Sequence, residues 1–222
     1  MRIKLNFSNS KFVFNEFLNK EVNGFINKLL GEGNKYHGRF SRYSVSSIQG
    51  AVWNGDVYTF PNGGSVYISS DDAEFISLII GGIMSASNLK IRDMKYINME
   101  ICDFEVGKSY DIVRTISPIL ISDGEKLLTF RDENFLETLI KKSRKKLISC
   151  GLNEKIANTL ELELFHLEKA NTLSIKIGDA VNIGSRVMLI AKGDRKARKL
   201  IYELGFGKCT GFGFGAVSLN EK

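Results

Sequence analysis

Along the first hundred residues, apolar positions recur with a period of two, then of about 3.6, then of two again. Residues 1–7 alternate apolar and polar side chains, as a half-buried strand does. Residues 15–30 place their apolar side chains on one helical face, and the glycine-rich residues 31–34 end that helix. A second helix is predicted after Asp71 and Asp72, whose carboxylates suit an N-terminal cap. Further strands are predicted near residues 40–47, 57–60, 65–69 and 94–104, which completes the β-α-β-β-α-β order of a ferredoxin-like domain. Pro61-Asn62-Gly63-Gly64 predicts a β-hairpin between the runs on either side of it.

The second half of the chain repeats this order less clearly. Residues 110–116 are predicted as a strand and residues 132–150 as an amphipathic helix. Asp194 suits the N-cap of a last helix, and Gly205 suits its end. Strands are also predicted at residues 159–167, 172–177, 181–191 and 212–219. The halves meet near residues 106–109, so the sequence predicts two tandem ferredoxin-like (βαββαβ, RRM-like) α+β domains, residues 1–107 and 108–222.

Gly205 to Gly215 read G-F-G-K-C-T-G-F-G-F-G, with five glycines and one lysine, Lys208. So few side chains leave backbone N–H groups open, which suits phosphate binding. Close packing of the last strand against a helix would also select glycine. The segment is not a nucleoside-triphosphate loop, which needs Ser or Thr at Cys209. It is not a dinucleotide fingerprint either, because it follows a helix instead of opening one.

Composition narrows the class of protein. The 222 residues include 31 Lys+Arg and 25 Asp+Glu, and the net charge of +6 is consistent with a polyanionic partner. Three cysteines without C-x-x-C spacing and only two histidines argue against a disulfide framework or a metal centre. The chain shows no secretory signal pattern and no apolar run long enough to span a bilayer, so we expect a cytoplasmic protein without a membrane partner.

Three segments together resemble the RAMP superfamily of CRISPR-associated proteins and, within it, the repeat-processing endoribonucleases of the Cas-six family. They are the glycine-rich segment, Tyr36-His37 with the basic and aromatic residues 39–44, and Ile116-Ser117-Pro118-Ile119. The resemblance extends over nearly the whole chain in order and spacing. It implies a metal-independent endoribonuclease without a cofactor that cuts CRISPR precursor RNA within repeats. Attack by a 2′-OH would leave a 2′,3′-cyclic phosphate, or its opened form, and a 5′-OH.

The resemblance implies that His37 transfers a proton in this reaction. Imidazole can do so near neutral pH, because its unperturbed pKa is about 6.5. Arg39 is expected to stabilise the charge that develops on phosphorus, and Tyr43 to supply a hydroxyl. An ordinary loop histidine is the competing interpretation of His37. The other candidates that stay open are Arg42 and Lys35 for the charge and Tyr36 for the hydroxyl.

One departure from the family pattern bears on this prediction. Some relatives place a tyrosine in the first helix, facing the histidine, whereas residues 15–30 contain none and offer Phe25 or Asn27 as the nearest equivalents. The alternative function is therefore a non-catalytic RAMP subunit that caps or scaffolds a guide-RNA complex. CRISPR repeat RNA is the implied partner, while other CRISPR-associated subunits and a homodimer are left open.

RNA contacts are predicted from the basic clusters and the glycine-rich segment. The cluster at residues 141–146 is weighted equally as a solvated helix face and as an RNA contact. The basic helix before Gly205 is favoured for RNA. The predicted RNA-binding residues are Arg42, Arg195, Arg198, Lys199, Gly205, Gly207, Lys208, Gly211, Gly213 and Gly215. A surface or structurally satisfied role is predicted for His166, and packing is favoured over base stacking for Trp53, Tyr58 and Phe60.

Overall fold

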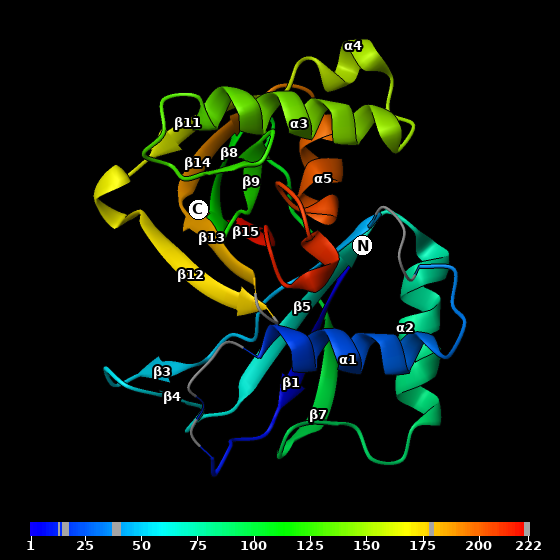
Figure 1. Ribbon diagram of the computed structural model, residues 1–222. Coiled ribbons are helices and arrows are strands. Elements are labelled where there is room, and N and C mark those ends of the chain that lie inside the picture. Colours follow the sequence, from blue (N-terminus) through cyan, green and yellow to red (C-terminus); the bar gives the residue numbers. More distant parts are fainter. Residues whose placement is uncertain (13, 15–17, 37–40, 178–179, 220–222) are drawn as a thin grey trace.

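Figure 1 shows the computed structural model, in which residues 1–222 are described except 13, 15–17, 37–40, 178–179 and 220–222. Two antiparallel sheets, one from each half of the chain, form its framework, and helices cover one face of each. In Figure 1 the sheet of the second half lies above that of the first half.

The lower sheet has the strand order β2-β5-β1-β7-β6. Its strands are β1 (Arg2–Phe7), β2 (Tyr43–Val45), β5 (Gly64–Ser70), β6 (Lys90–Ile91) and β7 (Met94–Ile101). Its helices are α1 (Asn19–Leu30) and α2 (Ala73–Ser85). Ile3, Leu5 and Phe7 are buried because alternate side chains of β1 point to the same face of the sheet, as the period of two predicted. Asp72 caps α2 by accepting from the backbone N–H groups of Glu74 and Phe75.

The upper sheet has the strand order β11-β14-β8-β15. Its strands are β8 (Tyr110–Thr115), β11 (Glu161–Phe165), β14 (Met188–Lys192) and β15 (Val217–Leu219). Its helices are α3 (Phe135–Ser149), the short α4 (Glu154–Ala157) and α5 (Arg195–Leu204), with 3-10 turns at Leu167–Lys169 and Thr210–Phe212. The main strands of both sheets, counted along the chain within each half, therefore lie in the same 2-3-1-4 order. This confirms the predicted α+β class with tandem ferredoxin-like folds.

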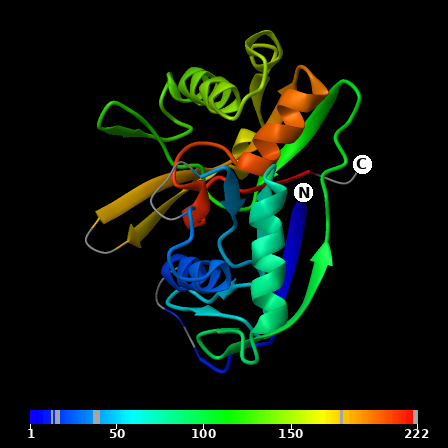
Figure 2. The same cartoon turned by 90° about the vertical axis from the view of Figure 1, so that its right-hand side faces the viewer.

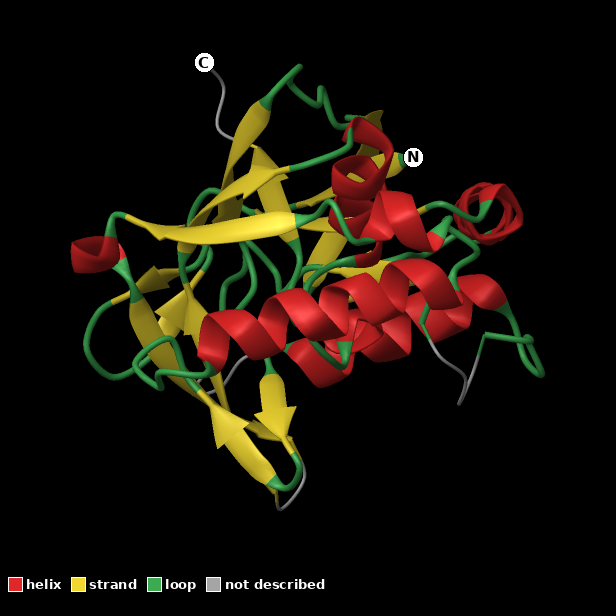
Figure 3. Cartoon of the chain, turned by 90° about the horizontal axis from the view of Figure 1, so that it is seen from above, coloured by secondary structure: helices red, strands yellow, loops and turns green. Residues whose placement is uncertain are grey.

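Three two-stranded hairpins are added to this framework. They are β3 (Val52–Trp53) with β4 (Tyr58–Thr59), β9 (Ile121–Asp123) with β10 (Lys126–Leu128), and β12 (Asn171–Ile177) with β13 (Ala180–Arg186). The β12–β13 hairpin projects from the body of the molecule in Figures 2 and 3. The predicted single strand at 181–191 was wrong, because its first part pairs with β12 and only its second part enters the sheet.

Two other predicted elements differ from the structure. A turn closes at Gly63, whose N–H donates to Phe60 O (3.2 Å), but the runs beside it do not pair. The strand β5 has β1 and β2 on its two edges, so β4 pairs with β3 instead. The last strand begins only at Val217, since Gly213 and Gly215 have positive φ angles that a strand does not accommodate.

Two large hydrophobic clusters form the cores. One runs from Ile3 to Met94 and the other from Phe104 to Val217. The halves are joined at Ser117, whose Oγ accepts from Ser47 N (2.8 Å), and at Ile116, whose carbonyl accepts from the Gln49 side chain (2.9 Å). None of the helices in the described residues is long and apolar enough to cross a bilayer.

A buried ion pair ties α5 to the segment that enters the upper sheet. The side chain of Arg198 is 0% exposed and pairs with Asp111, and it also donates to Gly107 O (2.8 Å) and Gly193 O (3.0 Å). The Tyr202 hydroxyl donates to the same carboxylate (2.9 Å). Burial and the Asp111 charge raise the pKa of Tyr202, which keeps this hydroxyl protonated as a donor.

Arg198→Ala is expected to lower the free energy of unfolding by about 3–5 kcal/mol, because it leaves the Asp111 carboxylate buried without its cation. Denaturant unfolding followed by circular dichroism measures the loss. Lys196→Ala is the matched control, since Lys196 is exposed on the same helix, and it should change stability by less than about 0.5 kcal/mol. Equal, small effects of both variants would contradict a structural role for Arg198.

Candidate functional site

The glycine-rich loop, residues 205–215, lies between α1 and α3, as Figures 1 and 2 show from two directions. Two asparagines on one face of α1 hold it. Asn19 Nδ2 donates to Phe212 O (3.3 Å) and Gly213 O (3.4 Å), and Asn23 Nδ2 donates to Gly211 O (3.3 Å). The loop therefore connects the helix layers of the two halves.

The five loop glycines are packed against protein atoms. Gly205, Gly207, Gly213 and Gly215 have positive φ angles, which disfavour other residues. At two glycines an added Cβ would meet a backbone oxygen: Leu120 O at 2.4 Å from Gly207 and Phe206 O at 1.8 Å from Gly215. At the other three it would meet a side chain: Ser44 Cβ at 2.9 Å from Gly205, the Tyr43 ring at 2.8 Å from Gly211 and the Asn19 side chain at 2.8 Å from Gly213. Close packing accounts for all five, and it was the alternative in the sequence analysis. Contact of these glycines with RNA stays a prediction.

Lys146 of α3 supports the same loop from the other side. Its buried ammonium donates to Leu204 O (2.8 Å), Gly205 O (3.0 Å) and Thr210 Oγ1 (3.1 Å). The two carbonyls belong to the C-terminal end of α5, where a helix favours positive charge. Burial lowers the pKa of Lys146 to about 7. Lys146 of the basic cluster at 141–146 is thus a structural residue, and Arg144 of the same cluster donates to Leu160 O (2.8 and 3.0 Å).

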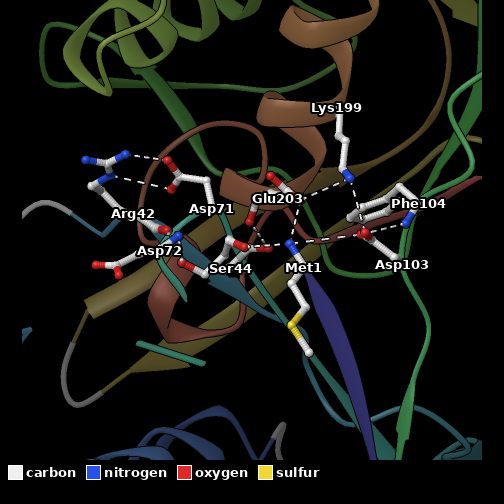
Figure 4. A network of polar contacts seen from close by, with 10 residues as sticks. Met1, Arg42, Ser44, Asp71, Asp72, Asp103, Phe104, Lys199 and Glu203 are labelled. Carbon is white, nitrogen blue, oxygen red and sulfur yellow. Dashed lines mark hydrogen bonds and ion pairs between the residues drawn. The ribbon is translucent and has the colours of Figure 1, made fainter. Parts of the chain in front are cut away.

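The described residues on either side of 37–40 meet at the N-terminus of α2. The Tyr36 hydroxyl donates to Asp72 Oδ2 (2.9 Å), and Arg42 forms an ion pair with Asp71, which Figure 4 shows from close by. A Cβ on Gly211 would lie 2.9 Å from Ser41 Oγ, so Ser41 adjoins the glycine-rich loop. The structure brings the neighbours of the predicted catalytic segment together with that loop.

Of the three predicted catalytic residues, the structure describes only Tyr43. His37 and Arg39 lie outside the described residues. Tyr43 is buried and stacks on Phe75 with ring centroids 4.2 Å apart, and burial raises the pKa of its hydroxyl. This setting limits its access to RNA, and its catalytic role stays a prediction. The alternative hydroxyl, that of Tyr36, is engaged by Asp72.

The two residues of α1 that stand nearest to the family's helix tyrosine, Phe25 and Asn27, have different surroundings. Phe25 belongs to the lower core and packs edge-on against Phe7. Asn27 donates to the Asn23 side chain (2.9 Å) and so continues the face of α1 that holds the loop. His166 is exposed beside Glu168, with Nδ1 and Oε1 2.8 Å apart, which confirms the surface interpretation.

The basic helix α5 contributes less unpaired positive charge to the surface than its sequence predicts. Arg198 was predicted to bind RNA, and this was wrong, because its guanidinium is enclosed and paired with Asp111. Lys199 is partly exposed, but Figure 4 shows it paired with Asp103 (3.1 Å) and near Glu203 (4.0 Å). Arg195 is exposed and reaches an open groove of about 1400 Å³. The groove is also lined by Arg2, Tyr67, Phe104, Lys108 and Tyr110.

Two lysines converge at the exposed side of the glycine-rich loop. Lys208 Nζ donates to Ser122 Oγ (3.2 Å), and Lys142 Nζ donates to Ser122 O. Neither lysine forms an ion pair with a carboxylate among the described residues. Both ammonium groups are therefore available to a phosphate. Lys142 was not among the predicted RNA-binding residues.

A sequence signal for Lys142 was present. Residues 135, 139, 142 and 146 follow one face of α3, and Phe135, Leu139 and Lys146 on that face are buried. Lys142 belongs to this face, so its side chain extends from α3 toward the neighbouring segment and reaches Ser122. Lys141, Lys142 and Lys145 are all exposed, and Lys142 is set apart by its hydrogen bond to Ser122 O.

Comparison with known proteins identifies the class and the family. The structure superimposes on "An RAMP protein binding different RNA substrates" with a TM-score of 0.82 and 23% identity, over 100% of both chains. It superimposes on the structure titled "Characterization of a Cas6-related gene from Pyrococcus furiosus" with a TM-score of 0.80 and 24% identity, over 100% of this chain and 99% of the other. The tandem fold is thus that of RAMP proteins.

Sequence comparison is more specific. Residues 102–219 match the family described as "CRISPR associated protein Cas6, C-terminal". An endoribonuclease-like Cas6 protein of Pyrococcus furiosus is 30% identical over 170 residues, which cover 71% of this chain and 68% of the relative. The "CRISPR-associated endoribonuclease Cas6 1" of Methanocaldococcus jannaschii is 28% identical over 188 residues, 81% of this chain and 73% of the relative. The chain belongs to the CRISPR-associated Cas6 family, which confirms the resemblance in the sequence.

Gly213→Ala is expected to lower stability by more than about 1 kcal/mol, because φ is +84° and the new methyl group meets Asn19. If Gly213 serves packing alone, the folded fraction should keep its affinity for repeat RNA. Gly24→Ala is the control: nothing lies within 4 Å of its Cβ, and alanine stabilises a helix by roughly 0.5–1 kcal/mol. Thermal melts and filter binding decide; weaker RNA binding at unchanged stability would instead support phosphate contact by the glycine.

Lys142→Ala and Lys208→Ala should each reduce the dependence of RNA affinity on salt. Every phosphate neutralised on a single strand contributes about −0.7 to the log–log slope, so the double variant should lose roughly 1.4. Lys141→Ala, on the exposed face of the same helix, is the control and should leave the slope unchanged. A control that loses as much as the Lys142 variant would place the RNA elsewhere on α3.

Proposed function

We propose that this protein is an endoribonuclease that cuts CRISPR precursor RNA within its repeats to release guide RNAs. Membership of the Cas6 family carries the proposal, because a relative covering 81% of the chain is named a CRISPR-associated endoribonuclease. The net charge of +6 suits a polyanionic substrate. Lys142 and Lys208, which both donate to Ser122, add a place where such a substrate can bind.

The proposed reaction needs no metal ion. The 2′-OH before the cut attacks the adjacent phosphorus and loses its proton, the bond to the 5′ oxygen breaks, and that oxygen takes up a proton. The products are a 2′,3′-cyclic phosphate and a 5′-OH. His37 transfers one of these protons, and Arg39 stabilises the charge on the phosphoryl oxygens. Arg42 is less suited to that task because Asp71 already neutralises it.

The surroundings of the catalytic segment support this assignment. Tyr36 and Arg42 attach its two sides to Asp72 and Asp71, and Ser41 adjoins the glycine-rich loop. These contacts position the described residues next to His37 and Arg39 in the sequence, and positioned groups favour catalysis by reducing the entropy lost on binding. The same loop carries Lys208, so one RNA strand that passes Ser41 can also contact Lys208.

The remaining parts of the proposal concern organisation. We place the division between an N-terminal domain with the catalytic segment and a C-terminal domain with the glycine-rich loop at residues 1–107 and 108–222. CRISPR repeat RNA is the proposed partner. Association with other CRISPR-associated subunits, a homodimer and a cytoplasmic location stay predictions.

A non-catalytic RAMP subunit is the second candidate. The side of α1 that faces the loop carries Asn19, Asn23 and Asn27 and no tyrosine, and at least two of these amides hold the loop. Side chains that are used to hold the loop do not take part in RNA cleavage, which favours a subunit that binds RNA without cutting it. The presence of His37 in the segment that resembles the family's histidine segment favours the enzyme.

His37→Ala should lower the cleavage rate of repeat RNA by roughly 10²–10⁴-fold and leave RNA affinity nearly unchanged, because it removes a proton-transfer group. Single-turnover cleavage and filter binding measure the two effects. Near-normal cutting by the variant would show that another residue transfers the proton.

Metal-independent attack by the 2′-OH is tested separately from the role of His37. RNA with a 2′-deoxy nucleotide before the cut should not be cleaved, since the attacking hydroxyl is gone, and EDTA should have little effect on the natural substrate. Cleavage of the deoxy substrate, or loss of activity in EDTA that Mg²⁺ restores, would refute the proposed chemistry.

A further inference from the structure

The β3–β4 hairpin presents an exposed tryptophan that packs on a half-buried tyrosine. Trp53 is 50% exposed, and its ring centroid lies 4.5 Å from that of Tyr58 on the paired strand. Tyr58 is anchored, because its backbone N–H and C=O both pair with Phe14 (2.7 and 2.9 Å). Phe60 is buried, as predicted, but Trp53 is not a core residue. The hairpin therefore holds the Trp53 ring half in water on a tyrosine that itself packs against the lower core.

Two arginines of the other half have no acidic partner among the described residues. Arg114 is exposed on β8 opposite Met188, and Arg186 ends β13 two residues before Met188. Neither forms an ion pair with a described carboxylate, and Arg186 Nε is buried with no hydrogen-bond partner among the described residues. Burial and the nearby Arg114 charge lower the pKa of Arg186, which a bound anion would reverse.

The junction between the halves brings these groups together. Gln49, three residues before β3, donates to Ile116 O (2.9 Å), and Ile116 is two residues after Arg114. Ser185, next to Arg186, pairs with Ile119 of the same junction segment. Tyr58 is close enough to Arg186 to favour the charge of its guanidinium. In Figure 1 the β3–β4 and β12–β13 hairpins both lie on the left of the molecule.

We propose that Trp53 stacks on an unpaired base of bound RNA while Arg114 and Arg186 contact the phosphates beside it. We call these three residues, with Tyr58, the hairpin–arginine site; its assignment to RNA rests on the proposed function. An aromatic platform next to uncompensated cations is the usual construction of a single-strand binding site, because every base has a stacking face and every linkage a negative charge. The only carboxylate of the β3–β4 hairpin, Asp56, lies at its turn.

Trp53 is the only tryptophan of the chain, so the unmodified protein reports on this contact. Single-stranded repeat RNA with a 2′-deoxy nucleotide at the cut should quench its fluorescence in a saturable titration. The same sequence as a perfect duplex should quench less, since its bases are already stacked. Heparin, a polyanion without bases, should bind without quenching. Replacing one nucleotide at a time by an abasic site should abolish quenching at one or two positions only.

Substitutions separate stacking from charge. Trp53→Leu should weaken RNA binding about 5- to 150-fold, the loss expected for one base–aromatic stack, and Trp53→Phe should recover much of it. Val52→Ala is the matched control, because Val52 is the equally exposed neighbour on the same strand. Arg114→Gln and Arg186→Gln should each reduce the salt slope by about 0.7 and leave saturating quenching unchanged. Thermal melts establish that each variant is folded.

Unchanged affinity of a folded Trp53→Leu variant, or equal quenching by RNA and heparin, would overturn the proposal. Dissociation of a dimer or loss of a protein partner by this variant, with RNA affinity intact, would do the same by assigning the surface to protein contact. Failure of the proposed function gives a different result. A wild-type protein that shows RNA quenching but does not cleave repeat RNA would refute the endoribonuclease and support the stacking site.

Discussion

The insertion of the glycine-rich loop between α1 and α3 is the contact on which the rest of the structure depends. Gly215 packs against Phe206 O so closely that no Cβ fits, and its N–H donates to Pro118 O (2.9 Å). Asn19 and Asn23 hold the loop from the lower half, and Lys146 holds it from the upper half. Together with the junction at Ile116 and Ser117, this segment sets how the two sheets with their helices are placed relative to each other.

This packing also distributes the positive charge. Lys146 and Arg198 are enclosed and serve α5 and the loop, where a lost partner would leave a buried charge or carbonyl unsatisfied. Lys142 and Lys208, which reach the surface beside the same loop, have only Ser122 as a hydrogen-bond acceptor among the described residues. Basic residues adjacent in sequence thus divide into structural and surface groups according to the direction in which the helix turns them.

The junction around Ile116-Ser117-Pro118 connects the two proposed RNA contacts. On one side, Pro118 O binds the end of the glycine-rich loop, whose Gly211 adjoins Ser41. On the other, Ile116 O binds Gln49, and the hairpin–arginine site follows. A strand that reached both regions would contact both halves of the protein, and its binding would then depend on their fixed placement.

The sequence by itself determined the class of fold, because periods of two and 3.6 report which side chains must share a face, and Asp72, Asp194 and Gly205 mark helix ends through local hydrogen bonding and φ preference. It also determined the Cas6 family through the order of its motifs. Tertiary structure alone decided that the loop glycines pack, that Arg198 is enclosed and that Trp53 is exposed. Most of these outcomes depend on residues far away in the sequence, such as Asn19 for Gly213 and Asp111 for Arg198, or on which strand edge is already occupied, as at β5, and no local pattern records either.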